Sequence, residues 1–127
     1  MEQKGACLIE ISHCSLDASL RIKHQVGIVS KENEACFLPE APIVRQAASV
    51  PSSIVENLRT PEVMEDIIES GAADMVSICR PLIREPDLIK RLKADDRSPA
   101  DCMSCGKYLD LDDSVKMHIR CRRLKEN

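Results

Sequence analysis

The stretch SICRPLIREPDL, residues 77–88, marks the passage from an apolar run to an amphipathic one. The residues from Met75 to Cys79 are apolar apart from one serine, which is typical of a strand buried on both faces of a sheet. Pro86 and Asp87 then favour the start of a helix, whose expected inward residues are Leu88, Ile89 and Leu92. The stretch therefore predicts a buried strand, a tight connection and a helix.

Two further apolar runs, Cys7 to Ile11 and Val50 to Val55, read as strands of the same kind. A helix with clear boundaries is predicted between the second and third strands: Thr60 suits its N-cap, Pro61 its first position and Gly71 its stop. One stripe of this helix is apolar and should face the sheet: Val63, Met64, Ile67 and Ile68. Strand, helix and strand in this order predict a βαβ unit of an α/β fold.

The remaining segments give weaker signals. Residues 37–48 predict another helix, starting at or after Pro39 because proline suits only a first turn, with Ile43, Val44 and Ala47 inward. Residues 12–34 read as a long, partly irregular connection. The polar residues 93–99 read as a linker, which divides the chain into a larger domain of residues 1–97 and a small cysteine-containing tail of residues 98–127.

Composition excludes several classes of function. The chain has 127 residues, a net charge of -3 and a single tyrosine and phenylalanine as its aromatic residues, so neither its electrostatics nor base stacking favours nucleic acid or an anionic membrane as a partner. No apolar run approaches the roughly 20 residues that span a bilayer, and the polar first residues do not resemble a signal peptide. We expect a cytoplasmic protein with reduced thiols.

Three motifs carry a resemblance to a known family: Glu10-Ile11-Ser12, LRTPEV at residues 58–63 and, above all, residues 77–88. On these motifs the chain resembles the old yellow enzyme, or NADH:flavin oxidoreductase, family from about Cys7 to Cys121. The resemblance implies a (β/α)8 TIM barrel, of which these motifs belong to the last three strands. Since such barrels need roughly 250 residues, we expect a partial barrel that contains the last three strand-helix units and lacks the first five strands.

The resemblance also implies an FMN site. In barrels of this type a phosphate is commonly held by the loops after strands 7 and 8, and the implied cofactor-binding residues here are Glu56, Asn57, Cys79 and Arg80. Arg80 is the expected phosphate ligand, with a surface ion pair to Glu56 or Glu85 as the alternative. Relatives place glycines where this chain has Glu56 and Asn57, which should weaken FMN binding.

No catalytic residue is assigned from the sequence, because in this family the groups that hold the flavin ring and donate the proton come from the strands that are lacking. His13 reads as a solvent-facing loop residue, since it has no identifiable partner group. The implied partners are FMN and NAD(P)H in the complete enzyme, and either a homo-oligomer or a chain that supplies the N-terminal strands of the barrel. The alternative function is a non-catalytic α/β oligomerising module with a zinc-stabilised tail.

The tail contains a possible metal site. Cys102 and Cys105 form a C-x-x-C pair, and His118 and Cys121 follow it, which is a ligand set that suits zinc. Related flavin enzymes carry an iron-sulfur cluster here on four cysteines, but Tyr108 or Leu109 stands where the third would be. Zinc, an iron-sulfur cluster and no metal therefore all remain open.

Overall fold

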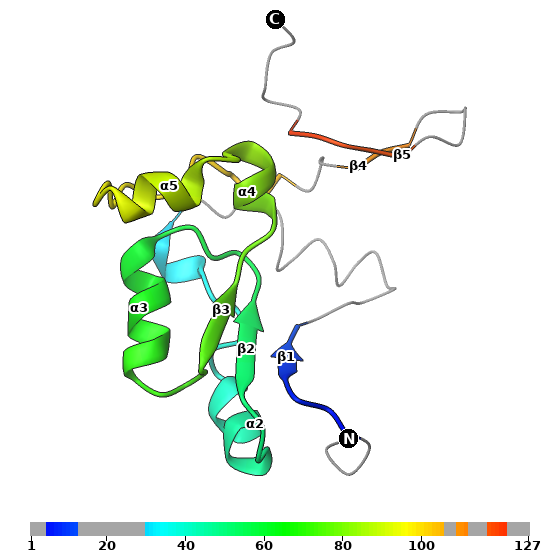
Figure 1. Ribbon diagram of the computed structural model, residues 1–127, viewed down its shortest axis with the longest axis vertical. Coiled ribbons are helices and arrows are strands. Elements are labelled where there is room, and N and C mark those ends of the chain that lie inside the picture. The colour runs from blue at the N-terminus through cyan, green and yellow to red at the C-terminus, as the bar shows by residue number, and fades with distance from the viewer. Residues whose placement is uncertain (1–4, 13–29, 106–108, 112–116, 122–127) are drawn as a thin grey trace, which may run out of the picture.

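The computed structural model describes residues 5–12, 30–105, 109–111 and 117–121. Three short strands, β1 (Ile9–Ile11), β2 (Ser52–Val55) and β3 (Met75–Ser77), form a parallel sheet in the order β1-β2-β3 (Figure 1). All three predicted strands are thus confirmed, each shorter than expected. The chain is an α/β fold, and β2 is central among the strands described.

The helices lie at different positions around this sheet. Figure 1 shows α2 (Ala41–Ala47) near the amino end of β2, and α3 (Pro61–Glu69) running beside β3. Beyond the carboxyl ends of β2 and β3 lie α4 (Arg80–Arg84) and α5 (Leu88–Lys93). None of the helices in the described ranges is long and apolar enough to cross a bilayer.

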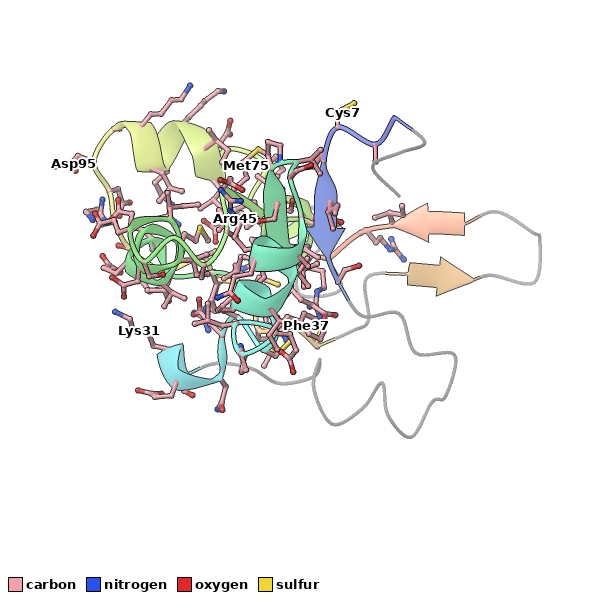
Figure 2. The ribbon with its side chains drawn as sticks, turned by 90° about the horizontal axis from the view of Figure 1, so that it is seen from below. Cys7, Lys31, Phe37, Arg45, Met75 and Asp95 are labelled. Carbon is pink, nitrogen blue, oxygen red and sulfur yellow. The ribbon has the colours of Figure 1, made fainter. Side chains whose placement is uncertain are left out.

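The core sits between β2 and its covering helices. Its largest fully buried apolar side chains are Ile54 of β2, Leu58 after it and Ile67 of α3, each at most 1% exposed. Small residues complete the cluster and let the elements approach closely: Ala35, Ala41, Ala72 and Ala73. Phe37, which is labelled in Figure 2, and Met64 are among the partly buried residues packed against it.

Two serines inside β2 are buried because each finds a polar partner, as buried polar groups must. The backbone N–H of Ser52 donates to Asp74 Oδ2 at 2.8 Å, and the hydroxyl of Ser52 reaches the same oxygen at 3.3 Å. This backbone hydrogen bond lowers the pKa of Asp74. The hydroxyls of Ser53 and Ser77 lie 2.8 Å apart and join β2 to β3.

The predicted helix between β2 and β3 is confirmed, with two corrections. Thr60 occupies the N-cap position, but its side chain makes no capping hydrogen bond. Gly71 has a φ of +71° and follows the helix as predicted, because glycine adopts this conformation without steric cost. Ile67 faces inward, whereas Ile68, predicted inward, is 41% exposed. One step of 100° beyond Ile67 carries a side chain past the buried stripe.

The other helices also correct the predicted inward faces. In α2 the buried residue is Ala41, and Val44 packs against the core, but Ile43 is 69% exposed and Ala47 is exposed as well. In α5 Leu88 is buried, whereas Ile89, predicted inward, is 43% exposed. In both helices the sequence predicted more inward-facing residues than a short helix buries.

A short helix, α4, was not predicted from the sequence. The strand expected to run to Cys79 ends at Ser77, and Cys79 becomes the residue that precedes α4, with φ −124° and ψ −68°. Its carbonyl oxygen accepts the backbone N–H groups of Leu82 and Ile83. A helix of five residues with a proline in its first turn has too little periodicity to be recognised from sequence.

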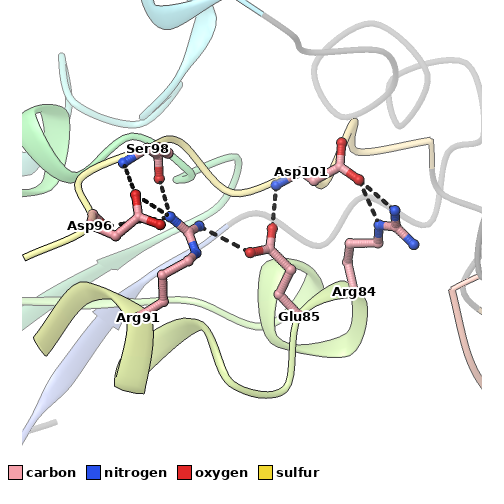
Figure 3. Close-up of polar contacts among 6 residues, drawn as sticks. All are labelled: Arg84, Glu85, Arg91, Asp96, Ser98 and Asp101. Atoms are coloured by element: carbon pink, nitrogen blue, oxygen red, sulfur yellow. Dashed lines mark hydrogen bonds and ion pairs between the residues drawn. The ribbon is translucent and has the colours of Figure 1, made fainter. Parts of the chain in front are cut away.

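The segment after α5, predicted as a linker, folds back onto the domain (Figure 3). The Arg91 guanidinium binds the Glu85 carboxylate at 3.0 Å and the Ser98 carbonyl at 2.8 Å, and the backbone N–H of Asp101 donates to Glu85. Arg97 pairs with two carboxylates of α3. These contacts fix the start of the tail against α3, α4 and α5.

Further along the chain, β4 (Leu109–Leu111) and β5 (Met117–Ile119) form a separate antiparallel pair, which was not predicted. Most of the connection expected over residues 12–34 lies outside the described residues. In its described part, Lys31–Asn33 forms a short 3-10 turn. The predicted division at residue 97 stays a prediction.

Candidate anion site at the strand ends

The two loops expected to hold a phosphate lie next to each other. Val55 and Ser77 are paired in the parallel register, so the loops that follow β2 and β3 leave the same edge of the sheet. Across this edge the Arg80 guanidinium donates to Asn57 Oδ1 at 2.7 Å. The structure thus brings Asn57 and Arg80 together, although 23 residues separate them in the chain.

The backbone after β2 has an unusual shape. Glu56 has a φ of 101° and Asn57 a φ of 55°, which is a region that side chains with a Cβ occupy at a steric cost. Glycine adopts such angles freely. The conformation is therefore the one that glycines would favour at these two positions, and it persists here with a carboxylate and an amide in their place.

A third segment, from before α2, reaches the same loop. The Cys36 thiol lies 3.9 Å from Glu56 Oε2, and the Asn57 side-chain amide donates to its sulfur at 3.9 Å. Burial, followed by the neighbouring Glu56 carboxylate, raises the pKa of the Cys36 thiol to about 11. The thiol is thus protonated at neutral pH, and a protonated thiol is a weak nucleophile.

Glu34 lies two residues before this cysteine and is 8% exposed. Its Oε2 accepts the backbone N–H groups of Arg59 and Thr60, each at 2.9 Å, and its Oε1 accepts the Thr60 hydroxyl at 2.6 Å. The two backbone amides just before α3, including that of its N-cap residue, are thereby satisfied by a carboxylate from outside the helix. The sequence pointed to neither Glu34 nor Cys36, because each lies 20 or more positions from its partners in the chain.

The other implied site residues differ in their surroundings. The Cys79 side chain is exposed, and its carbonyl oxygen serves the first turn of α4. Glu85, one of the two carboxylates considered as a partner for Arg80, faces Arg91 and the Asp101 amide instead. His13 lies outside the described residues.

The predicted metal ligands do not assemble in the part of the chain that the structure describes. Within residues 5–12, 30–105, 109–111 and 117–121 no group of three or more Cys, His, Asp or Glu side chains is placed to hold an ion. Cys102, Cys105 and Cys121 are free and half-buried, and the side chain of His118 lies outside the description. A hydrogen bond to Asp101, with a smaller contribution from Cys121, raises the pKa of Arg84.

Comparison with known proteins agrees with the motifs. Residues 7–98 match the model of the NADH:flavin oxidoreductase / NADH oxidase family. A bilirubin reductase of Mediterraneibacter gnavus (strain CC55_001C) is 38% identical over 74 residues, which cover 57% of this chain and 12% of that protein. A 4,4'-dithiodibutanoate disulfide reductase of Rhodococcus erythropolis is 28% identical over 76 residues, which cover 60% of this chain and 19% of that protein. The match thus spans less than a fifth of the length of either relative.

Proposed function

Because the chain belongs to the NADH:flavin oxidoreductase / NADH oxidase family, we propose that it forms the end of an FMN-binding barrel that holds the flavin phosphate. In this proposal β1, β2 and β3 are the last three strands of a (β/α)8 barrel, and the other five strands come from elsewhere in the assembled enzyme. FMN, when bound, supplies the redox-active ring. The residues of this chain bind and orient only its phosphate.

The observation that carries the proposal is the contact between Arg80 and the loop after β2. A guanidinium at the shared end of two parallel strands is well suited to a phosphate, which it binds through two parallel charge-assisted hydrogen bonds. The positive φ angles of Glu56 and Asn57 shape the loop as glycines would, and glycine loops allow a phosphate to approach the backbone. The residues therefore fit the group in position and shape.

The charge at the loop works against tight binding. The Arg80 guanidinium donates one hydrogen bond to the neutral Asn57 oxygen, and charge-assisted hydrogen bonds from its other N–H groups favour a phosphate. The Glu56 carboxylate, however, lies in the same loop and repels an anion. We therefore propose that the site binds FMN more tightly than riboflavin. The preference should be smaller than it would be with glycines at positions 56 and 57.

The complete enzyme would use NAD(P)H as its hydride source, as the family description suggests. Both relatives are named as reductases, which supports a reductive reaction but assigns no substrate to this chain. The chain by itself should not turn over substrate, because the ring-binding and proton-donating strands are lacking. Turnover of an activated alkene by the purified chain with added FMN and NADPH, lost in Arg80→Ala, would contradict this.

The same proposal requires a partner for the open sheet edges. Among the described strands β1 and β3 each have a neighbour on one side only, and unpaired edges of parallel strands tend to recruit further strands. We propose either a homo-oligomer or a complex with a chain that carries the N-terminal strands. The alternative of a zinc-stabilised, non-catalytic module gains no support from the described residues, which bring no three metal ligands together.

The test compares two flavins that differ only by the phosphate. FMN and riboflavin are titrated by fluorescence quenching into the full chain, into Arg80→Ala and into the charge-matched control Lys90→Ala, whose side chain is exposed on α5. Losing a hydrogen-bonded charge pair of about 1.5–3 kcal/mol predicts a roughly 10- to 100-fold loss of FMN affinity in Arg80→Ala alone. Equal affinity of the full chain for FMN and riboflavin would refute the proposal.

A further inference from the structure

The segment Glu34 to Cys36 contacts the candidate anion loop, residues 56–60, near both of its ends. Glu34 binds the backbone of Arg59 and Thr60, and the Cys36 thiol contacts Glu56 and Asn57. Two residues from one short segment thus contact both halves of residues 56–60. We call Glu34, Ala35 and Cys36 the clasp.

Ala35, between the two contacting residues, is only 3% exposed and has a φ of 51°. An L-residue adopts this conformation at a steric cost, so the surrounding contacts have to maintain it. Here the turn at Ala35 allows Glu34 and Cys36 to contact different parts of the same loop. The clasp therefore has a defined shape in the folded chain.

Glu34 makes the stronger of the two attachments. A carboxylate that accepts two backbone N–H groups and one hydroxyl fixes the backbone of Arg59 and Thr60, immediately before α3. The Thr60 side chain donates to Glu34 and so does not cap its own helix. Without Glu34, the amides of Arg59 and Thr60 lose the acceptor that holds them in the folded chain.

The loop that Glu34 anchors also contains the residue that binds Arg80. Asn57 lies between Glu56 and the anchored residues, and its side-chain oxygen receives the Arg80 guanidinium. We propose that Glu34 is a positioning residue for the candidate anion site, because it holds residues 56–60 in the shape that places Asn57 and Arg80 together. It also accepts the two backbone amides just before α3, those of Arg59 and the N-cap residue Thr60, so these two amides are already satisfied within the chain.

The inference rests on the proposed function only where it concerns FMN. Its first readout is local order: amide hydrogen exchange of residues 56–60, followed in the full chain. Glu34→Ala should speed exchange at Arg59 and Thr60 at least tenfold relative to the rest of β2 and α3. Glu34→Gln should restore slow exchange, since its amide oxygen can accept both N–H groups and its NH2 can donate to the Thr60 hydroxyl.

The second readout is the ratio of FMN to riboflavin affinity. Glu34→Ala should lower this ratio about tenfold, and Glu34→Gln should keep it or raise it, because the glutamine retains the contacts and removes a negative charge. Ile67→Ala, which opens a cavity on the buried side of α3, controls for loss of stability and should leave the ratio unchanged.

The outcomes separate the two proposals. Unchanged local exchange in Glu34→Ala, or faster exchange spread over the whole chain as in Ile67→Ala, would overturn the positioning role. Faster local exchange with an unchanged ratio of FMN to riboflavin affinity would overturn it too, because the ordering of the loop would then have no effect on the position of Arg80. If the unmodified chain shows no preference for FMN, the proposed function fails, and the exchange result still decides whether Glu34 holds the loop.

Discussion

Replacing Glu56 with glycine tests whether the backbone of the candidate anion loop is strained. Its φ of 101° costs a residue with a Cβ about 1–2 kcal/mol, and glycine removes that cost. Glycine also gives the unfolded chain more freedom, which lowers stability by roughly 0.5–1 kcal/mol. The contact of Glu56 with the Cys36 thiol subtracts little, because a thiol is a weak donor. We therefore expect Glu56→Gly to raise the free energy of unfolding by about 0.5–1 kcal/mol.

The assay is urea unfolding of the full chain followed by far-UV circular dichroism. Glu65→Gly is the matched control, since Glu65 is an exposed carboxylate within α3, where glycine should destabilise by about 0.5–1 kcal/mol. Opposite signs for the two substitutions are the expected result. Equal destabilisation by both would show that the loop after β2 is not strained and would refute the reasoning. Glu56→Gly should also strengthen FMN binding and leave riboflavin binding unchanged, because it removes a charge near the phosphate.

Three further measurements test the fold and its titratable groups. Burial raises the pKa of the Cys36 thiol from 9.0 to about 11, so its protonated form contributes stability that is present below pH 9 and lost as the pH rises through 11; Cys36→Ala should flatten that decline in the free energy of unfolding. Ile67→Ala should destabilise the chain by about 2–5 kcal/mol and Ile68→Ala by less than about 1 kcal/mol, and comparable losses in urea unfolding would contradict the observed inward face of α3. Glu85→Ala should remove one partner of Arg91 and the acceptor of the Asp101 amide and so speed tryptic cleavage after α5. An unchanged cleavage rate would show that the Glu85 contacts do not hold the segment.

The main elements could be predicted because their signals are local. Apolar runs of the right length identified all three parallel strands, and Pro61 with Gly71 bounded α3. These features depend on conformational preferences of single residues and on periodicity, which act within a few positions of the chain. The predicted family was confirmed for the same reason, since its motifs are continuous stretches that the family match over residues 7–98 includes.

The finer features depended on contacts that no local pattern specifies. The inward faces of α2 and α5 were predicted too wide, because a short helix buries only the residues that meet the core. The strand expected to end at Cys79 ends two residues earlier, at Ser77, and α4 begins at Arg80, where the carbonyl of Cys79 accepts amides of that helix. The residues expected to form a linker are held by Arg91 and Arg97.

At the candidate site, the sequence by itself determined which residues follow the strands. It placed Asn57 after β2 and Arg80 after β3, and parallel strands carry such residues to one edge. Only the tertiary structure showed that Arg80 binds the Asn57 side chain and that the clasp of Glu34 and Cys36 closes over the loop. These partners lie 20 or more positions apart in the chain. A hydrogen bond depends on distance and direction in space, which spacing along the chain does not reveal.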